Sequence, residues 1–483
     1  MNNTSKYISL LALLAVIFSA CKKQWDQRDK VTDQQLNVTV MQQINANADL
    51  SIFASYLTKT GYDKLLNSTK TYTVWAPNNT AMQAVDQSVL TDTAKLRVFI
   101  ANHIANQVYL TNEPQPSMRI HNLLGKNVTF TPTKVEDANI IKANQYVKNG
   151  VVHTIDKALT VKQSIWQYIN SLTGVGQEDK TYLINQNYIV IDTSAATVTG
   201  VDPTTGKPIL KPGTGVVNKN YYFDNVADLS NEDKLYTHII LTDAAFDAER
   251  NMVSKYFVTS TPDSTYNLSA FNIVKDLTIN GVVTPDQLPD HLVSVNNVNV
   301  PINKAAIVQT YNASNGIVYV MSSVNFNLAD KITPIYIQGE NPSYFSRTDK
   351  GGDIFFRVKK DNQGQIFNDI FISGTGSNGA LPAKFFAAYN LNKLYSCQYT
   401  VYWRAVNDIQ TTAISQQLSF ASPTAGTFPY TSVPPNVYTE TQLGNYTMTR
   451  YGYMSMFLIG ANSTTAGTNS LTLDYVKLVP VLQ

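Results

Sequence analysis

Five histidines and two cysteines are the residues of this 483-residue chain best suited to metal, acid–base or nucleophilic chemistry. The histidines are far apart in sequence, so no Cys/His cluster and no HExxH spacing is present. The chain also lacks a GxSxG elbow, a P-loop and a GxGxxG segment. We therefore expect no metal, no cofactor and no enzymatic activity. Paired carboxylates for glycoside cleavage stay open, because they need only spatial proximity.

Cys21 follows an apolar run over residues 8–20 that is too short to span a bilayer but suits a signal-peptide core. Phe18–Cys21 resembles a bacterial lipobox, which implies cleavage before Cys21 and acylation of its thiol and new amine. Residues 1–21 are thus expected to be a lipoprotein signal, with an ordinary secretory signal as the alternative. Residues 22–36 are polar and predict a tether, or a short docked helix at their later end.

The charge balance is close to neutral, with 37 Lys and Arg against 35 Asp and Glu, and shows no basic stripe. We therefore expect no nucleic-acid partner. If Cys21 carries lipid, Cys397 has no intramolecular partner, so an exported chain must rely on its hydrophobic cores. Cys397 falls on the expected core face of a strand, which favours a packed thiol over a nucleophile. The length suggests about three domains.

Two segments frame the first third of the chain, Thr73–Met82 and Asn149–Leu159. Each predicts a strand that stops at a turn, because Pro77 cannot continue a ladder and Asn78 or Asn79 can cap a following helix. Together with a helix between them that ends at His103, they resemble the fasciclin domain. The resemblance implies an α+β module over residues 37–160.

The same resemblance places His103 and His153 near one another, with Asn79 and Asp156 close to the same strands. One interpretation is an adhesion or partner surface. The other is a buried polar network in which each imidazole bonds the backbone or a neighbouring carbonyl, and we favour it.

A divergent second copy is expected over residues 161–338. Thr237–Phe246 aligns with Thr73–Met82, and Asn315–Val320 aligns with Asn149–Thr154. The separation from Thr237 to Asn315 is 78 positions, close to the 76 positions from Thr73 to Asn149, which indicates an internal repeat. Leu241 replaces the strand-ending proline and Tyr319 replaces His153, so functions that depend on those residues are expected to be lost in this copy.

The second copy carries about 51 extra residues between its first helix and its first main strand. This insertion, about 176–230, is rich in Gly and Pro and predicts an exposed hairpin or lid. Strands are expected at Tyr188–Ile191 and Tyr221–Phe223.

Period-two runs dominate residues 343–483 and predict an all-β sandwich. The end of the chain, Leu471–Pro480, resembles the ending of jelly-roll sandwiches that include many carbohydrate-binding modules. Tyr402 and Arg404, on the more polar face of a strand, are candidate glycan contacts. The alternatives are a solvated strand face or a contact with another domain. Trp403 is expected in the core.

The expected architecture is therefore α+β, with two fasciclin-like modules followed by an all-β, jelly-roll-like sandwich. We expect a lipid-anchored outer-membrane protein of the Bacteroidota type, non-enzymatic, that binds glycan, matrix or a partner protein. One alternative is an accessory glycan-binding subunit of an outer-membrane polysaccharide-uptake system. A carbohydrate-active hydrolase is the second alternative.

Overall fold

A computed structural model of the chain describes residues 33–483 except 113–115, 376–379 and 466. The expected signal, Cys21 and most of the tether lie outside the described residues. The chain separates into two compact units. The first extends to residue 169 and includes 229–235 and 312–316, and the second contains the remaining residues.

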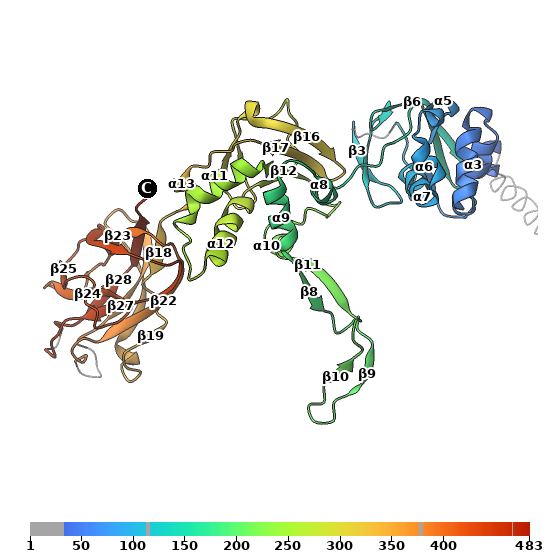
Figure 1. The fold of residues 1–483 in the computed structure, drawn as a ribbon. Coiled ribbons are helices and arrows are strands. Elements are labelled where there is room, and N and C mark those ends of the chain that lie inside the picture. The colour runs from blue at the N-terminus through green and yellow to red at the C-terminus, as the bar shows by residue number, and fades with distance from the viewer. Residues whose placement is uncertain (1–32, 113–115, 376–379, 466) are drawn as a thin grey trace, which may run out of the picture. The chain divides into compact units, whose positions relative to one another are not determined.

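The first unit is built around a seven-stranded sheet that contains a parallel pair of strands (Figure 1). β1 (Tyr72–Pro77) pairs with β7 (Gly150–Ile155), and every residue of both strands is buried. Such strands read as continuous apolar runs because both faces are covered. The sheet order is β2-β1-β7-β6-β5-β4-β3. The other strands are β2 (Ile104–Ala105), β3 (Met118–His121), β4 (Asn127–Phe130), β5 (Lys134–Val135) and β6 (Ala138–Val147).

Short helices cover this sheet. They are α2 (Val40–Asn45), α3 (Ser51–Thr60), α4 (Tyr62–Leu66), α5 (Asn79–Gln83), α6 (Gln87–Thr91) and α7 (Thr93–Asn102), with 3-10 turns at Gln34–Asn37 and Ala48–Leu50. Asn78 caps α5 as predicted, since its Oδ1 accepts the N–H of Ala81 at 2.8 Å. The helix and strand boundaries at this turn were therefore readable from local chemistry.

A second sheet has the strand order β13-β12-β17-β16, which matches β2-β1-β7-β6 position by position. Its strands are β12 (Tyr236–Leu241), β13 (Thr278–Asn280), β16 (Ile307–Ala313) and β17 (Gly316–Met321). The helices of this region are α8 (Ile165–Ser171), α9 (Gln177–Asn185), α10 (Tyr221–Asn225), α11 (Asp243–Ser254), α12 (Pro262–Val274) and α13 (Leu328–Lys331), with a 3-10 turn at Lys304–Ala306. β14 (His291–Val293) and β15 (Asn299–Pro301) form a separate hairpin.

Equivalent side chains make equivalent bonds in the two copies. Asn149 accepts the N–H of Val40 and donates to the carbonyl of Leu66 at the end of α4 and to that of Ser68 in the loop before β1, all at 2.8 Å. Asn315 accepts the N–H of Ile165 at 2.8 Å and donates to two carbonyls before β12, both at 3.0 Å. The repeat seen in the sequence is therefore a repeat of hydrogen-bonding roles as well as of strand order.

The insertion forms an arm of two successive hairpin ribbons (Figure 1). β8 (Asn187–Ile191) pairs with β11 (Val216–Asn220), and β9 (Val198–Val201) pairs with β10 (Pro208–Leu210). The strand expected at Tyr188–Ile191 is present, but the one expected at Tyr221–Phe223 is wrong. Those residues begin α10, because the Asn220 side chain accepts the N–H groups of Tyr222 and Phe223 and caps a helix there.

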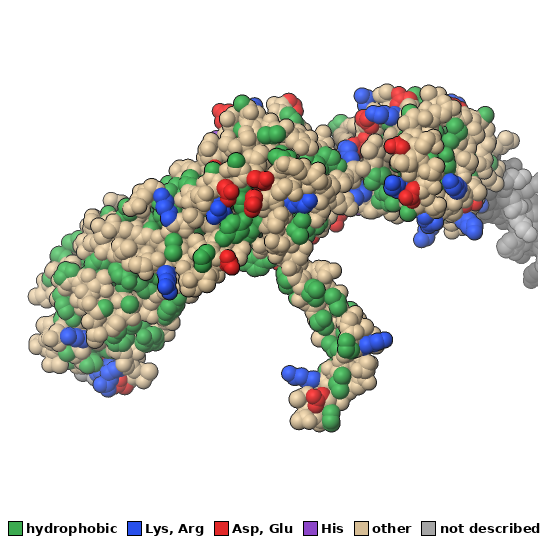
Figure 2. Space-filling model, in the orientation of Figure 1, with side chains coloured by type: hydrophobic (Ala, Val, Ile, Leu, Met, Phe, Trp, Pro, Cys, Tyr) green, Lys and Arg blue, Asp and Glu red, His purple; other side chains and the backbone are tan. Residues whose placement is uncertain are grey.

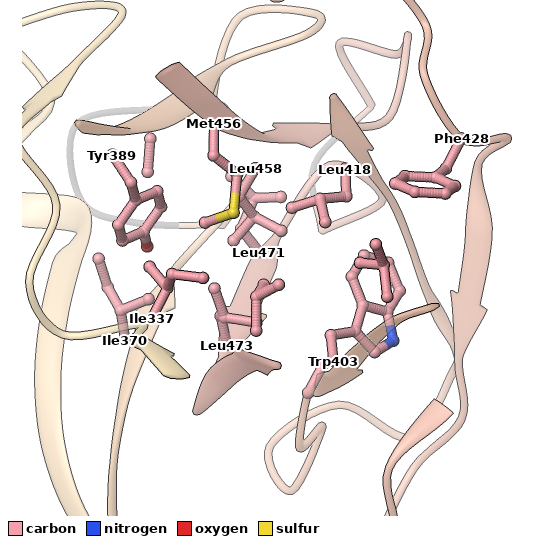
Figure 3. Packing of buried hydrophobic residues seen from close by; sticks show 14 of the residues in the cluster. Ile337, Ile370, Tyr389, Trp403, Leu418, Phe428, Met456, Leu458, Leu471 and Leu473 are labelled. Atoms are coloured by element: carbon pink, nitrogen blue, oxygen red, sulfur yellow. The ribbon is translucent and has the colours of Figure 1, made fainter. Parts of the chain in front are cut away.

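The C-terminal region is a sandwich of antiparallel sheets around one hydrophobic core (Figure 3). One sheet contains β18 (Ile335–Gln338), β29 (Tyr475–Pro480), β23 (Gln398–Arg404) and β26 (Thr441–Thr447). A second contains β19 (Tyr344–Phe345), β22 (Phe386–Leu394), β27 (Gly452–Gly460), β24 (Ile414–Phe420) and β25 (Thr431–Val433). A third contains β20 (Ile354–Lys360), β21 (Ile366–Ile372) and β28 (Leu471–Leu473), and a 3-10 turn at Gly351–Asp353 precedes it. Trp403 lies in the core as expected. The whole fold is α+β.

One expected boundary needs correction. We placed residues up to 338 in the second module, but Ile335–Gln338 pairs with Tyr475–Leu478 and is a strand of the sandwich. Residues Gly339–Pro342, which separate the two expected domains, form a turn inside the sandwich after its first strand, where the Gly339 N–H donates to the carbonyl of Asp474 at 2.6 Å. A turn and a domain boundary share the same residue types, so composition did not separate them.

Candidate functional site

An aromatic row crosses the outer face of the sandwich sheet that contains β23. Tyr336 lies opposite Lys477, Lys477 opposite Tyr402, and Tyr402 opposite Gln442. Alternate residues of these strands point into the core, so the row faces away from it. Tyr336 is 52% exposed. The exposed Tyr336 and the half-buried Tyr402 thus lie on the outer face of the sheet with a cation between them.

Electrostatic contacts hold this row in place. The Lys477 ammonium lies 5.4 Å from the centre of the Tyr402 ring and 5.9 Å from that of Tyr336. Glu440 accepts from Lys477 at 3.0 Å and from the Tyr475 hydroxyl at 2.8 Å. The hydrogen bond to Glu440 raises the pKa of Lys477, so the lysine stays charged at neutral pH. The Tyr475 ring meets Tyr336 edge-on at 5.4 Å. The row, defined here as the tyrosine face, consists of Tyr336, Tyr402, Tyr475, Lys477, Glu440 and Gln442.

Arg404, the other expected glycan contact, is committed elsewhere. Its guanidinium donates to Asp474 at 2.6 Å, to Asp361 at 3.1 Å and to the carbonyl of Tyr438 at 2.8 Å. Its plane lies over the Phe367 ring at 4.5 Å. A side chain with these partners braces the sandwich, and its donors are not offered to a ligand.

Two buried carboxylates of the sandwich, Asp474 and Asp369, are likewise paired with arginines, whereas both oxygens of the buried Asp353 carboxylate have no hydrogen-bond partner. Burial raises the pKa of Asp474 to about 6, although the Arg404 guanidinium lowers it. Burial also raises the pKa of Asp369, whose partner is Arg357. Cys397 is half-buried, and burial raises the pKa of its thiol to about 11, so it is a poor nucleophile at neutral pH. Among the described residues, no group of three His, Cys, Asp or Glu side chains is placed to hold a metal.

His103 is completely buried in the first unit. Its Nδ1 lies 2.8 Å from the Phe99 carbonyl, which can only accept, so Nδ1 carries the proton. Its Nε2 accepts the N–H of Leu159 at 2.9 Å. Burial lowers the pKa of His103 to about 4. The imidazole is thus neutral and ties the end of α7 to the chain beyond β7.

His153 has the opposite tautomer and a different environment. Its Nε2 donates to the Tyr109 carbonyl at 2.9 Å and its Nδ1 accepts the N–H of Asn144 at 3.3 Å. Its ring meets Phe130 edge-on, whereas His103 contacts Phe99 in another hydrophobic cluster. Burial lowers the pKa of His153 as well. Both rings have backbone partners and neither reaches the surface.

Asn79 and Asp156 do not join the histidines in one cluster. The Asn79 side chain accepts the N–H of Ile52 at 3.0 Å and donates to the Ala48 carbonyl at 3.0 Å, which anchors the start of α3. Asp156 accepts the N–H and side-chain amide of Asn139, at 2.8 and 2.7 Å. In the second copy Tyr319 substitutes for His153, and its hydroxyl donates to a loop carbonyl at 2.7 Å. The polar residues expected from the fasciclin resemblance therefore hold neighbouring segments of the chain together.

An apolar groove of about 810 Å³ lies on the first unit between α5, α6, α7 and residues 156–161. Small apolar side chains line most of it, including Ala84, Val85, Val98 and Val161. Asp86, Lys95 and Lys157 are also part of the lining. The sequence did not indicate this groove, because its lining comes from segments about 80 residues apart.

Residues 48–161 match the fasciclin domain model. This confirms the resemblance stated for the first module. No curated protein matches the chain. Among solved structures, the chain is similar to a FAS1 domain pair from the insect cell adhesion molecule Fasciclin I. The identity is 14%, the match covers 59% of this chain and 100% of that one, and the TM-score is 0.24.

The chain is also similar to two carbohydrate-binding modules of family 6. One is a β-1,3-glucan-binding module from Bacillus halodurans, at 13% identity, covering 30% of this chain and 95% of that one with a TM-score of 0.21. The other is the C-terminal module of a marine laminarinase from Zobellia galactanivorans, at 14% identity, with coverages of 30% and 99% and a TM-score of 0.19.

Sequence reasoning found Tyr402 but missed the other residues of the tyrosine face, which are Tyr336, Tyr475, Lys477, Glu440 and Gln442. The available signal was weak: Tyr336 and Lys477 alternate with apolar neighbours on short strands, which marks an outward face. The two strands are about 140 positions apart, so only their pairing register brings these residues together. No helix in the described part of the chain is long and apolar enough to cross a membrane.

Proposed function

We propose that this protein is a non-enzymatic, lipid-anchored outer-membrane protein that binds an extended glycan on its tyrosine face. The observation that carries the proposal is the outward-facing row in which Lys477 lies between Tyr336 and Tyr402. Tyrosine rings are apolar in body and polar at the tip, so they can stack on a sugar ring and bond its hydroxyls.

The spacing of the row suits a chain of sugars. Neighbouring strands are about 5 Å apart, so Tyr336 and Tyr402, two strands apart, are separated by about 10 Å. That separation is comparable to the length of a disaccharide. Lys477, Glu440 and Gln442 supply donors and acceptors between and beyond the rings. An open face of this kind supports binding of internal chain segments in preference to chain ends.

A glycan array tests the proposal. The native chain should bind one glycan class, and the double variant Tyr336→Ala with Tyr402→Ala should lose that binding. Tyr344→Ala is the matched control, because Tyr344 is 48% exposed on β19 in the other sheet. Equal binding by the native chain and the double variant would refute the assignment.

Membrane attachment is a separate part of the proposal. The lipobox-like segment before Cys21 supports acylation, and a polar tether follows it. Cells that express the native chain should incorporate an alkyne-labelled palmitate into it and retain it in the outer-membrane fraction. Cys21→Ser should abolish both, and a labelled Cys21→Ser chain would contradict the anchor.

A second candidate function is adhesion to a partner protein through the apolar groove of the fasciclin module. Exposed apolar surface of this kind is typical of interaction sites. Val98→Asp places a charge in the groove at a side chain that is 43% exposed, so folding should persist. Loss of cell-surface adhesion with unchanged glycan binding would assign adhesion to the groove. Co-purification with an outer-membrane transporter would instead favour the accessory role in glycan uptake.

A further inference from the structure

The arm, residues 187–220, has no hydrophobic core of its own. Among the described residues its two sheets have two strands each, and an isolated two-stranded ribbon is marginal in water. Its strands nevertheless consist largely of Ile, Val and Tyr, and most of these side chains are exposed. Figure 2 shows hydrophobic side chains along the arm and few charges until near its tip. The function proposed above does not use this segment.

The two edges of the arm differ. The first strand of the outgoing limb, β8, contains no charged residue, no proline and no bulge, whereas β9 has a bulge at Thr199. The returning limb carries Pro208 at the start of β10 and Lys219 in β11. Lysine, proline and bulges are the devices that keep an edge from pairing with another strand. The edge of β8 is thus open, whereas the returning limb is protected.

We propose that the open edge of β8 pairs with β8 of a second copy of this chain. An antiparallel pair centred on Ile189 places Tyr188 opposite Val190 and Asn187 opposite Ile191, and it is two-fold symmetric. Because β8 is uncharged, no like charges meet in this self-pairing. The result is a four-stranded sheet, which removes both open edges at once.

The available surface matches this partner. Ile189 is 65% exposed and Ile191 is 51% exposed, and apolar side chains occupy both faces of the ribbon. Exposed apolar side chains also lie on the other strands of the arm, including Val198, Val201 and Ile209. A separate peptide strand that paired with β8 would cover the open edge of this one arm. Pairing with a second arm covers the open edges and apolar side chains of both arms.

Disulfide trapping tests the pairing in the full chain with Cys21→Ser and Cys397→Ser. Ile189→Cys should form a disulfide-linked dimer under mild oxidation, because the two copies of this residue face each other. Asn218→Cys is the matched control: Asn218 is exposed and lies opposite Ile189 on the protected limb, so this variant should form no disulfide-linked dimer.

Sedimentation velocity at tens of micromolar provides the second readout. The native chain should sediment as a dimer and Ile189→Lys as a monomer, with Val358→Lys, an exposed site on the sandwich, as the control that stays dimeric. A native chain that is monomeric would overturn the proposal and indicate a different partner. A dimer that persists in Ile189→Lys, or equal trapping at positions 189 and 218, would overturn it too.

Discussion

Replacing Asn149 by alanine removes three hydrogen bonds at once. The side chain is buried, and its partners are backbone groups at the start of α2, at the end of α4 and in the loop before β1. Each buried backbone group left without a partner costs about 1 kcal/mol or more, so the loss is about 3 kcal/mol or more. For a module of this size that corresponds to a fall of about 10 °C in Tm.

The measurement is thermal unfolding followed by circular dichroism, with hydrogen–deuterium exchange of the β1 amides as a local readout. Asn139→Ala is the matched control, since Asn139 bonds Asp156 at the surface and should change Tm little. Asn315→Ala should have the same effect on the β12 amides, because its three bonds have the same pattern. An Asn149→Ala chain as stable as Asn139→Ala would refute the reasoning. An Asn315→Ala chain with unchanged exchange of the β12 amides would refute the equivalence of the two copies.

Three further outcomes follow from buried groups. Burial raises the pKa of Asp179 to about 7, so its stabilising contribution is present below pH 3.8 and lost as pH rises to about 7. Asp179→Asn should therefore match the native urea midpoint near pH 4 and exceed it near pH 8, and equal midpoints near pH 8 would count against this. Burial lowers the pKa of His103 to about 4, so the native chain loses about 3 kcal/mol between pH 6.5 and pH 4. His103→Ala should lower Tm at neutral pH with glycan binding intact, and its deficit in calorimetry should shrink near pH 4; a constant deficit would contradict this. Gly150→Ala should abolish soluble expression, because φ is +151° and a Cβ would lie 2.0 Å from the Tyr72 carbonyl oxygen, whereas Gly61→Ala, with open space around it, should fold.

Local chemistry made part of the fold predictable. Asn78 beside Pro77 gave a strand end and a helix cap, and the structure has both. The repeat was visible because Asn149-Gly150 and Asn315-Gly316 occupy the same structural turn, with φ of 151° and 152° at the two glycines. Such features depend on residues that are adjacent in sequence.

Other features depend on distant residues and were not predictable. Leu241 replaces the proline of the first copy and so exposes a backbone N–H that the proline lacks. The structure pairs this N–H with Asp179, from α9, at 3.0 Å. Asp179, within the expected insertion, thus accepts the hydrogen bond that Leu241 needs to donate, but no local sequence pattern links Asp179 to Leu241. The tyrosine face was missed for the same reason, because strand register brings Tyr336 and Tyr402 into one row.

The most direct test of the central claim is calorimetric titration with oligosaccharides of increasing length, drawn from the glycan class that the array identifies. Affinity should rise until the chain spans Tyr336 and Tyr402 and then level off. In Tyr336→Ala the rise should stop one or two sugars earlier. An affinity that does not depend on length, or a length profile that Tyr336→Ala leaves unchanged, would contradict the account.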